Sequence, residues 1–181
     1  MSSHILEGES DMLNEKLVKM LSDQENYEFY SAYIYLGIAN YFADKNLNGF
    51  ANWFTIQTQE ERDHALLFNQ YLLNNGENPT LDAVDKYDNN YPDFRSPLET
   101  AAGHERKVTA RINDIYAAAF ELHDFRTMQF LDWFVKEQGE EEQNIDDILN
   151  RYDLFGTDAK SLYMLDQELS ARVYSAPSLV L

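Results

Sequence analysis

Residues 50–71 read FANWFTIQTQEERDHALLFNQY, and the fold can be argued outward from this stretch. Its large apolar side chains recur at alternating steps of four and three residues, the spacing of one face of an α-helix. The same spacing passes through polar positions in the middle of the stretch, at Gln57, Glu61 and His64. The segment therefore predicts a long helix whose inward face is apolar at both ends and polar at its centre.

Three other stretches repeat this arrangement, and Ser96-Pro97-Leu98-Glu99 predicts a capping box at the start of one of them. A short fifth pattern covers residues 158–172. We call the apolar face of each predicted helix a stripe. The stripes of these three stretches and their central polar residues are 17–42 with Glu28, 98–119 with Glu105, and 131–152 with Gln138 and Glu141.

The connections between these helices predict the topology. Two are short, so the first and second helices, and the third and fourth, should form antiparallel hairpins. The link over residues 76–95 is much longer, and about 20 residues at ~3.3 Å each can span ~60 Å. It can therefore run back along the bundle and join two parallel helices. The sequence predicts an all-α four-helix bundle with a long crossover between helices two and three and a short fifth helix at the C-terminal end.

Composition limits the function. The chain has 181 residues, enough for one domain, which we expect over residues 12–172 between an extension or cloning remnant at 1–11 and a tail at 173–181. Its formal charge of −18 argues against nucleic acid and anionic membranes as partners and would attract metal cations, but composition alone is better explained by a solvated acidic surface that keeps the protein soluble. The absence of cysteine excludes thiolate sites. With no apolar run long enough for a bilayer and no signal-peptide core, a cytoplasmic location is expected.

The polar centres of the stripes predict a metal site. A buried carboxylate is costly unless it is neutralised, and no basic residue lies on these helix faces. Any single acid of this kind could simply lie at the edge of a stripe, in contact with solvent. Four at matching heights are hard to explain in that way, so bound cations are the better explanation. Glu61 and His64 are three residues apart and share a face, and their oxygen and nitrogen donors suit Fe(II) or Mn(II).

Three segments closely resemble bacterial non-haem ferritins: 26–31 (NYEFYS), 59–64 (QEERDH) and 133–142 (WFVKEQGEEE). The resemblance extends over residues 12–172. It implies a protein that oxidises Fe(II) with O₂ or H₂O₂ at a di-iron ferroxidase centre and stores ferric mineral inside a hollow homo-oligomeric shell of twenty-four subunits. The fifth helix would then pack around the four-fold axes of the shell.

Residue by residue, the resemblance also implies the iron ligands. Glu28 and His64 would hold the first iron, Glu61 would bridge, and Glu105 would hold the second iron, which Glu141 would also reach. Gln138 would line the centre, beside the aromatic residues Tyr35 and Trp133. A third iron would be held by Glu60, Glu137, Glu140 and Glu141. Taken one at a time, Glu137, Glu140 and Glu142 fit a solvated acidic face equally well, and Tyr35 and Trp133 fit simple core aromatics.

Other members of the wider family match less well. Helix four carries Gln138-x-x-Glu141 in place of a second Glu-x-x-His, and Arg62 stands where bacterioferritins have the haem-ligating Met, so no haem is expected. His104 and His123 are expected at the surface. Two alternatives stay open: a di-iron oxidase that stores no iron, and a DNA-protecting mini-ferritin. Bulky neighbours of the centre argue against the first, and the absence of basic termini argues against the second.

Overall fold

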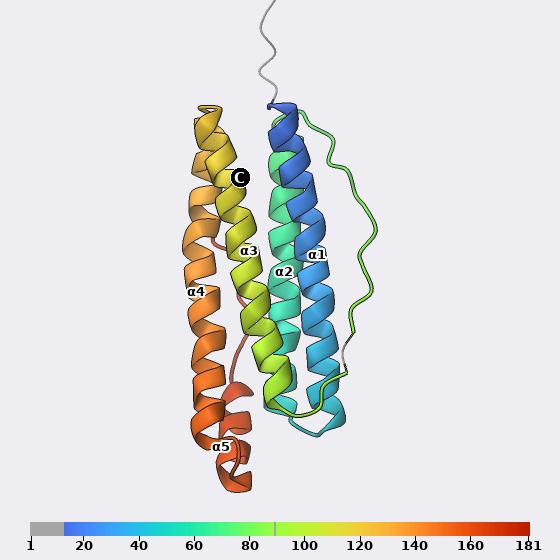
Figure 1. The fold of residues 1–181 in the computed structure, drawn as a ribbon, viewed down its shortest axis with the longest axis vertical. Coiled ribbons are helices and arrows are strands. Elements are labelled where there is room, and N and C mark those ends of the chain that lie inside the picture. The colour runs from blue at the N-terminus through green and yellow to red at the C-terminus, as the bar shows by residue number, and fades with distance from the viewer. Residues whose placement is uncertain (1–12, 89) are drawn as a thin grey trace, which may run out of the picture.

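A computed structural model describes residues 13–88 and 90–181 of the protein, and Figure 1 shows them as a bundle of long helices lying side by side. The predicted extension 1–11 lies outside these residues. The described part contains no strand and no helix apolar and long enough to cross a membrane. The helices are α1 (Glu15–Asp44), α2 (Asn48–Asn74), α3 (Arg95–Glu121), α4 (Phe125–Phe155) and the short α5 (Ala159–Leu169). The predicted fold class is confirmed.

The chain between α2 and α3 forms the predicted crossover. It leaves the end of α2, runs along the outside of α1 and returns to the opposite end of the bundle, so that α2 and α3 point the same way (Figure 1). Asn26 on α1 holds it in place, because its Nδ2 donates to the carbonyl of Thr80 at 2.9 Å and its Oδ1 accepts from the amide of Asp82 at 2.9 Å. The crossover is therefore tied to the bundle by hydrogen bonds between one α1 side chain and its own backbone groups.

The start of α3 differs from the prediction. The helix begins at Arg95, before Ser96, and Pro97 lies within its first turn. Asp93 provides the cap: its Oδ1 accepts from the backbone amides of Arg95 at 3.0 Å and Ser96 at 2.8 Å. The expected capping box at Ser96 is wrong because an acid two positions upstream of the helix reaches the same free amides.

The apolar core is divided into two halves along the bundle axis. One half surrounds Phe42, Phe50 and Phe54, and the other surrounds Leu21 and Phe68. Both contain side chains from all four long helices. Between the halves lie the polar centres of the four stripes. Two apolar core regions thus hold the bundle together, with a buried polar layer between them.

Helix α5 docks against the start of α2. The side chain of Asp166 accepts from the backbone amides of Gly49 at 2.8 Å and Phe50 at 3.0 Å, so an acid of α5 caps the amino end of α2. Only glycine fits at position 49, since a Cβ built there would lie 1.6 Å from the carbonyl oxygen of Asp166. The fifth helix is therefore an integral part of the domain.

The segment after α5 turns back along the bundle toward its other end (Figure 1). It lies against α2 and α4: Tyr174 donates its hydroxyl hydrogen bond to Asp63, and the indole of Trp133 donates to the Ser178 hydroxyl at 3.0 Å. Leu179 packs against the apolar half that contains Leu21. The predicted tail 173–181 thus covers one side of the bundle.

Candidate metal centre

The buried polar layer is built from polar side chains of all four long helices, most of them acids. Each lies on the inward face at mid-height because the stripes place it there, and each side chain is almost completely shielded from solvent. The layer consists of Glu28 from α1, Glu61 and His64 from α2, Glu105 from α3, and Gln138 and Glu141 from α4.

Two groups of these side chains have ligand atoms close enough to share a metal ion. One atom each from Glu28, Glu61 and His64 lie within 4.8 Å of one another. A second group, made of His64, Glu137 and Glu141, meets the same limit. His64 belongs to both groups, so one imidazole joins two adjacent acidic positions. Oxygen-rich donor sets with a single imidazole suit Fe(II) or Mn(II).

Burial changes the acid–base behaviour of the four central carboxyls. The pKa of each of Glu28, Glu61, Glu105 and Glu141 is raised to about 8, first because burial disfavours the charged form and then because another acid of the group repels it. One oxygen of Glu28, Oε2, is buried without a hydrogen-bond partner in the described structure. A cation would stabilise the ionised carboxylates and satisfy that oxygen, so the donor set fits a metal ion.

Glu105 is held from both sides. Tyr35 donates its hydroxyl hydrogen bond to Oε1 of Glu105, and the Gln138 amide donates to Oε2 at 3.1 Å. Burial, followed by repulsion from Glu105 and Glu61, raises the pKa of Tyr35 well above its usual value, so Tyr35 stays a protonated donor. Both residues proposed to line the centre therefore contact one of its acids directly.

Two glutamines in the layer had no functional assignment from the sequence. Gln24 donates to Oε1 of Glu28 at 2.8 Å, and Gln57 donates to Oε1 of Glu61 at 3.0 Å and to Oε2 of Glu141 at 2.9 Å. Each glutamine precedes its acid by four residues on the same helix, a spacing that places the two side chains together. That spacing is the sequence signal that could have found them.

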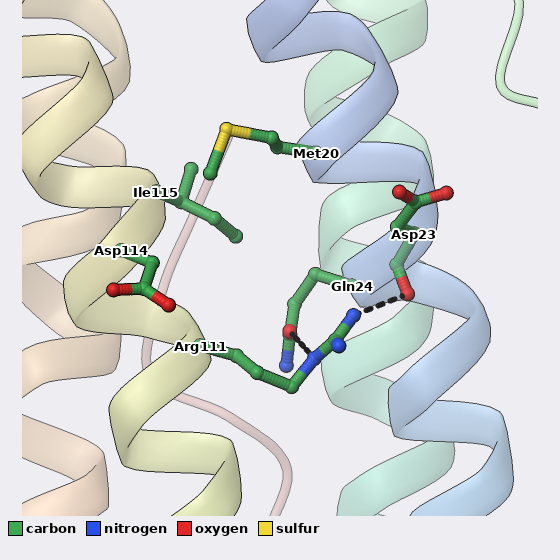
Figure 2. Close-up of a pocket in the computed structure, with 6 residues that line it drawn as sticks. All are labelled: Met20, Asp23, Gln24, Arg111, Asp114 and Ile115. Carbon is green, nitrogen blue, oxygen red and sulfur yellow. Dashed lines mark hydrogen bonds between the residues drawn. The ribbon is translucent and has the colours of Figure 1, made fainter.

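Arginine side chains reach the rim of the polar layer, although no arginine lies on the inward faces of the helices. Figure 2 shows Arg111 in a pocket of about 150 Å³ between α1 and α3, reaching across to Gln24 and Asp23. Its Nε donates to Oε1 of Gln24 at 2.8 Å. Within the described residues, no Lys or Arg forms an ion pair with the four central glutamates. Arg111 therefore orients a glutamine amide, and the four central glutamates keep no Lys or Arg partner within the part of the chain that the structure describes.

The four acids expected at a third iron site are only partly brought together. Glu137 joins Glu141 at His64, as described above. Glu60 instead forms an ion pair with Arg172, whose Nη2 is 2.6 Å from its Oε2. Glu140 is exposed and pairs with Lys136 at 3.3 Å. Glu140 thus lies outside both groups of candidate ligands.

His104 is not the surface residue that was expected. Its ring is 5% exposed, shares a hydrogen bond of 2.7 Å with the Ser31 hydroxyl and stacks on Tyr27 with ring centroids 5.1 Å apart. Burial, with nearby Lys107 and Arg111, lowers the pKa of His104 to about 4, so the ring is neutral. The helical spacing marked only the neighbouring Glu105 as inward. It could not show that the position of His104 faces α1. His123 is exposed in the turn before α4, as expected.

Trp133 lies beside the centre. Its ring meets the His64 ring edge-on, with centroids 5.6 Å apart, and Phe134 does the same at 5.8 Å. These aromatic rings enclose the imidazole and limit the orientations it can adopt. Trp133 therefore has the place expected of an aromatic neighbour of the centre.

Comparisons with known proteins agree on one family. Residues 18–155 match the family model described as a ferritin-like domain. A probable bacterial non-heme ferritin-like protein of Haemophilus influenzae is 33% identical over 158 residues, covering 87% of this chain and 96% of that protein. A bacterial non-heme ferritin of Staphylococcus aureus is 34% identical over 168 residues, covering 90% and 98%. An open-pore ferritin from the archaeon Archaeoglobus fulgidus has a TM-score of 0.87 at 39% identity, covering 89% and 99%.

Proposed function

The chain belongs to the ferritin family, and from this premise we propose that it binds Fe(II), oxidises it at the buried carboxylate layer and stores the ferric product inside a shell of its own subunits. The observation that carries the proposal is the layer itself. Four nearly inaccessible glutamates converge there from four helices, around one histidine and without a basic ion-pair partner in the described residues. Bound cations would neutralise the buried glutamates of this layer.

The ligands are proposed as follows. Glu28 and His64 hold one Fe(II), Glu61 bridges to a second, and Glu105 and Glu141 hold the second. The convergence of Glu28, Glu61 and His64 supports the first position. The hydrogen bonds from Tyr35 and Gln138 support the second, because they orient both oxygens of Glu105. A carboxylate bridge can hold two metal ions ~3.5–4 Å apart, which suits two-electron chemistry.

The proposed reaction uses that pairing. Each Fe(II) gives one electron, and the reduction of O₂ to H₂O₂, or of H₂O₂ to water, takes two electrons and two protons. Ionisation of the layer on Fe(II) binding releases protons, because the metal-free glutamates hold them with pKa values of about 8. The protein supplies ligand orientation and a site shielded from bulk water.

A third, weaker iron position is proposed on the side of the layer that faces the C-terminal segment. Glu137 and Glu141, together with His64, support it by their convergence. Glu60 can join once it leaves Arg172, and Glu140 can join only by rotating away from Lys136. The site is more accessible than the first two, because Glu137 is only half-buried, so we expect it to bind iron less tightly.

Storage and location complete the proposal. The similar archaeal structures are an open-pore ferritin and an engineered closed form of the Archaeoglobus fulgidus ferritin, which supports a hollow assembly here too. We propose a cytoplasmic shell of twenty-four subunits in which α5 lines the four-fold axes, without haem. The buried Tyr35, Phe68 and Phe134 fill the space that a di-iron oxidase would need for an organic substrate, which favours Fe(II) as the substrate.

Anaerobic addition of Fe(II) to purified metal-free protein, followed by rapid mixing with O₂ or H₂O₂, tests the function. The Fe(III) absorbance should rise within seconds at two Fe(II) per subunit. Repeated additions should then give an iron-filled particle that remains in solution and sediments faster than the apoprotein. Oxidation no faster than in buffer would contradict the ferroxidase activity, and ferric precipitation outside the particle would contradict storage.

A further inference from the structure

Arg172 joins the C-terminal segment to the edge of the carboxylate layer. Its Nη2 lies 2.6 Å from Oε2 of Glu60, and its Nη1 donates to Oε1 of Gln57 at 3.0 Å and to the carbonyl of Trp53 at 3.2 Å. The guanidinium also lies over the Trp53 ring, 4.3 Å from its centroid. A single side chain from the end of the chain thus makes four contacts with α2.

The backbone around Arg172 is anchored too. Asn52 donates to the carbonyl of Arg172 at 3.1 Å, and Tyr174 donates to Asp63. In the Arg172–Glu60 pair the side chains are only 20% and 17% exposed, so the charges interact more strongly than an ion pair in open solvent. The Arg172–Glu60 ion pair is therefore held in place by further hydrogen bonds of the C-terminal segment.

The same guanidinium acts on the centre through Gln57. By donating to the amide oxygen of Gln57, Arg172 leaves the amide nitrogen to face Glu61 and Glu141. Arg172 therefore neutralises one acid directly and orients the hydrogen bonds of two others. Glu137 lies on the same side of the layer, and among the described residues it forms no ion pair of this kind.

We propose that Arg172 is a built-in counter-cation for Glu60, and that a metal ion reaches Glu60 only when the Arg172 guanidinium withdraws. A guanidinium and a divalent ion repel each other and compete for the same carboxylate oxygens, so they do not share Glu60 at full occupancy. The C-terminal segment thereby sets the affinity of the third cation position. This inference rests on the proposed function, since it concerns the weakest of the proposed iron positions.

Binding of Mn(II) to the metal-free shell, followed by calorimetry and by electron paramagnetic resonance of free Mn(II), tests the competition without any oxidation step. Arg172→Met removes the charge and keeps an apolar chain against Trp53. It should raise the affinity of the weakest Mn(II) by about tenfold, the size expected when a partly buried ion pair no longer competes. Arg172→Lys keeps the charge and should stay close to wild type. Arg151→Met, which removes a cation paired with Glu168 instead, is the matched control and should change nothing.

The partner variant makes the test specific. In a Glu60→Gln background, Arg172→Met should have no further effect, because the ligand for which Arg172 competes is gone. An unchanged or lowered affinity in Arg172→Met, or the same gain with and without Glu60, would overturn the proposal. Should Arg172→Met fail to assemble, Mn(II)-soaked wild-type crystals decide: Mn(II) on Glu60 with Arg172 still in place would refute it. Failure of every variant and the wild type to bind Mn(II) would instead contradict the proposed function.

Discussion

Glu61 illustrates the contacts and the raised pKa of a carboxyl group in the buried polar layer. Its carboxylate converges with Glu28 and His64, accepts a hydrogen bond from Gln57, and has its pKa raised first by burial and then by Glu141. In a protein without metal, such a group costs folding free energy whenever it is ionised. The proposed metal binding would account for Glu61 in the core, because an apolar residue would pack there at lower cost.

Replacing Glu61 by Ala should therefore separate function from folding. Loss of the proposed bridge should lower the initial rate of Fe(II) oxidation by at least about a hundredfold, since even outer partners of metal ligands are worth 10–100-fold. The shell should still form. Stopped-flow absorbance and sedimentation measure the two effects. Glu121→Ala, an exposed acid at the end of α3, is the control and should oxidise Fe(II) normally. A wild-type rate in Glu61→Ala would place the oxidation elsewhere.

The raised pKa values predict how stability depends on pH. The four central glutamates have pKa values of about 8 in the folded protein, above the ordinary glutamate value of 4.5. Their contribution is most favourable below pH 4.5, where both states are protonated, and it is lost as pH rises through about 8. Metal-free protein should therefore melt at least about 5 °C lower at pH 8.5 than at pH 5.5.

The pH experiment needs two controls. Mn(II) added at pH 8.5 should recover the loss, because a cation takes the place of the protons. The double variant Glu61→Gln, Glu141→Gln removes two of the titrating groups, so its melting temperature should fall less over the same range. Calorimetry at fixed subunit concentration measures both. A variant as pH-sensitive as the wild type would show that the overall charge of −18 causes the effect instead.

Among the helices, α5 is the one whose position depends on a single close contact, between Asp166 of α5 and Gly49 of α2. Its Asp166 caps α2 through the amides of Gly49 and Phe50, and Leu165 and Leu169 belong to the core half around Phe54. The C-terminal segment that follows reaches Glu60 through Arg172. The docking of α5 therefore controls where that segment lies relative to the carboxylate layer.

Gly49→Ala should destabilise the protein and displace α5. The added Cβ would lie 1.6 Å from the backbone oxygen of Asp166, and backbone must move to admit it. We expect a loss of about 1–3 kcal/mol in the free energy of unfolding. Gly103→Ala, in the middle of α3, is the matched control, since its Cβ would meet nothing within 4 Å. It should stabilise by about 0.5–1 kcal/mol. Equal effects in denaturant titrations would contradict this account of the α2–α5 contact.

The surface of the whole molecule carries more exposed apolar side chains than a lone subunit requires. Tyr33 on α1, Leu66 on α2, and Phe120 and Phe125 at the α3–α4 turn are each about half exposed or more, and so is Tyr163 on α5. Phe29 on α1 is half-buried. Apolar groups at several places around a subunit suit an assembly in which each copy touches several neighbours.

Sedimentation at neutral pH and moderate salt should accordingly find one closed particle. With twenty-four copies of a 21.1 kDa chain, its mass should be roughly half a megadalton. Phe125→Ser, at an exposed position in the turn, should shift the distribution toward smaller species if that turn lies in an interface. A wild-type protein that sediments as a monomer or dimer under these conditions would contradict the storage function.

The sequence by itself determined the helices, their pairing and the residues of the buried layer. Periodicity is local: a side chain three or four positions along the same helix shares its face wherever the helix packs. Glu28, Glu61, His64, Glu105 and Glu141 could thus be placed on inward faces, and the long crossover could be inferred from its length. The family was recognisable for the same reason, because its distinctive residues lie in short runs.

Only the tertiary structure decided the contacts between segments far apart in the chain. Asp93 as the cap of α3, the burial of His104 against α1, and the approach of Arg172 to Glu60 all depend on how neighbouring elements meet. No spacing within one helix contains that information. The same holds for Gly49 beneath Asp166, where two backbones separated by more than a hundred residues come into contact and the free volume between them admits no side chain.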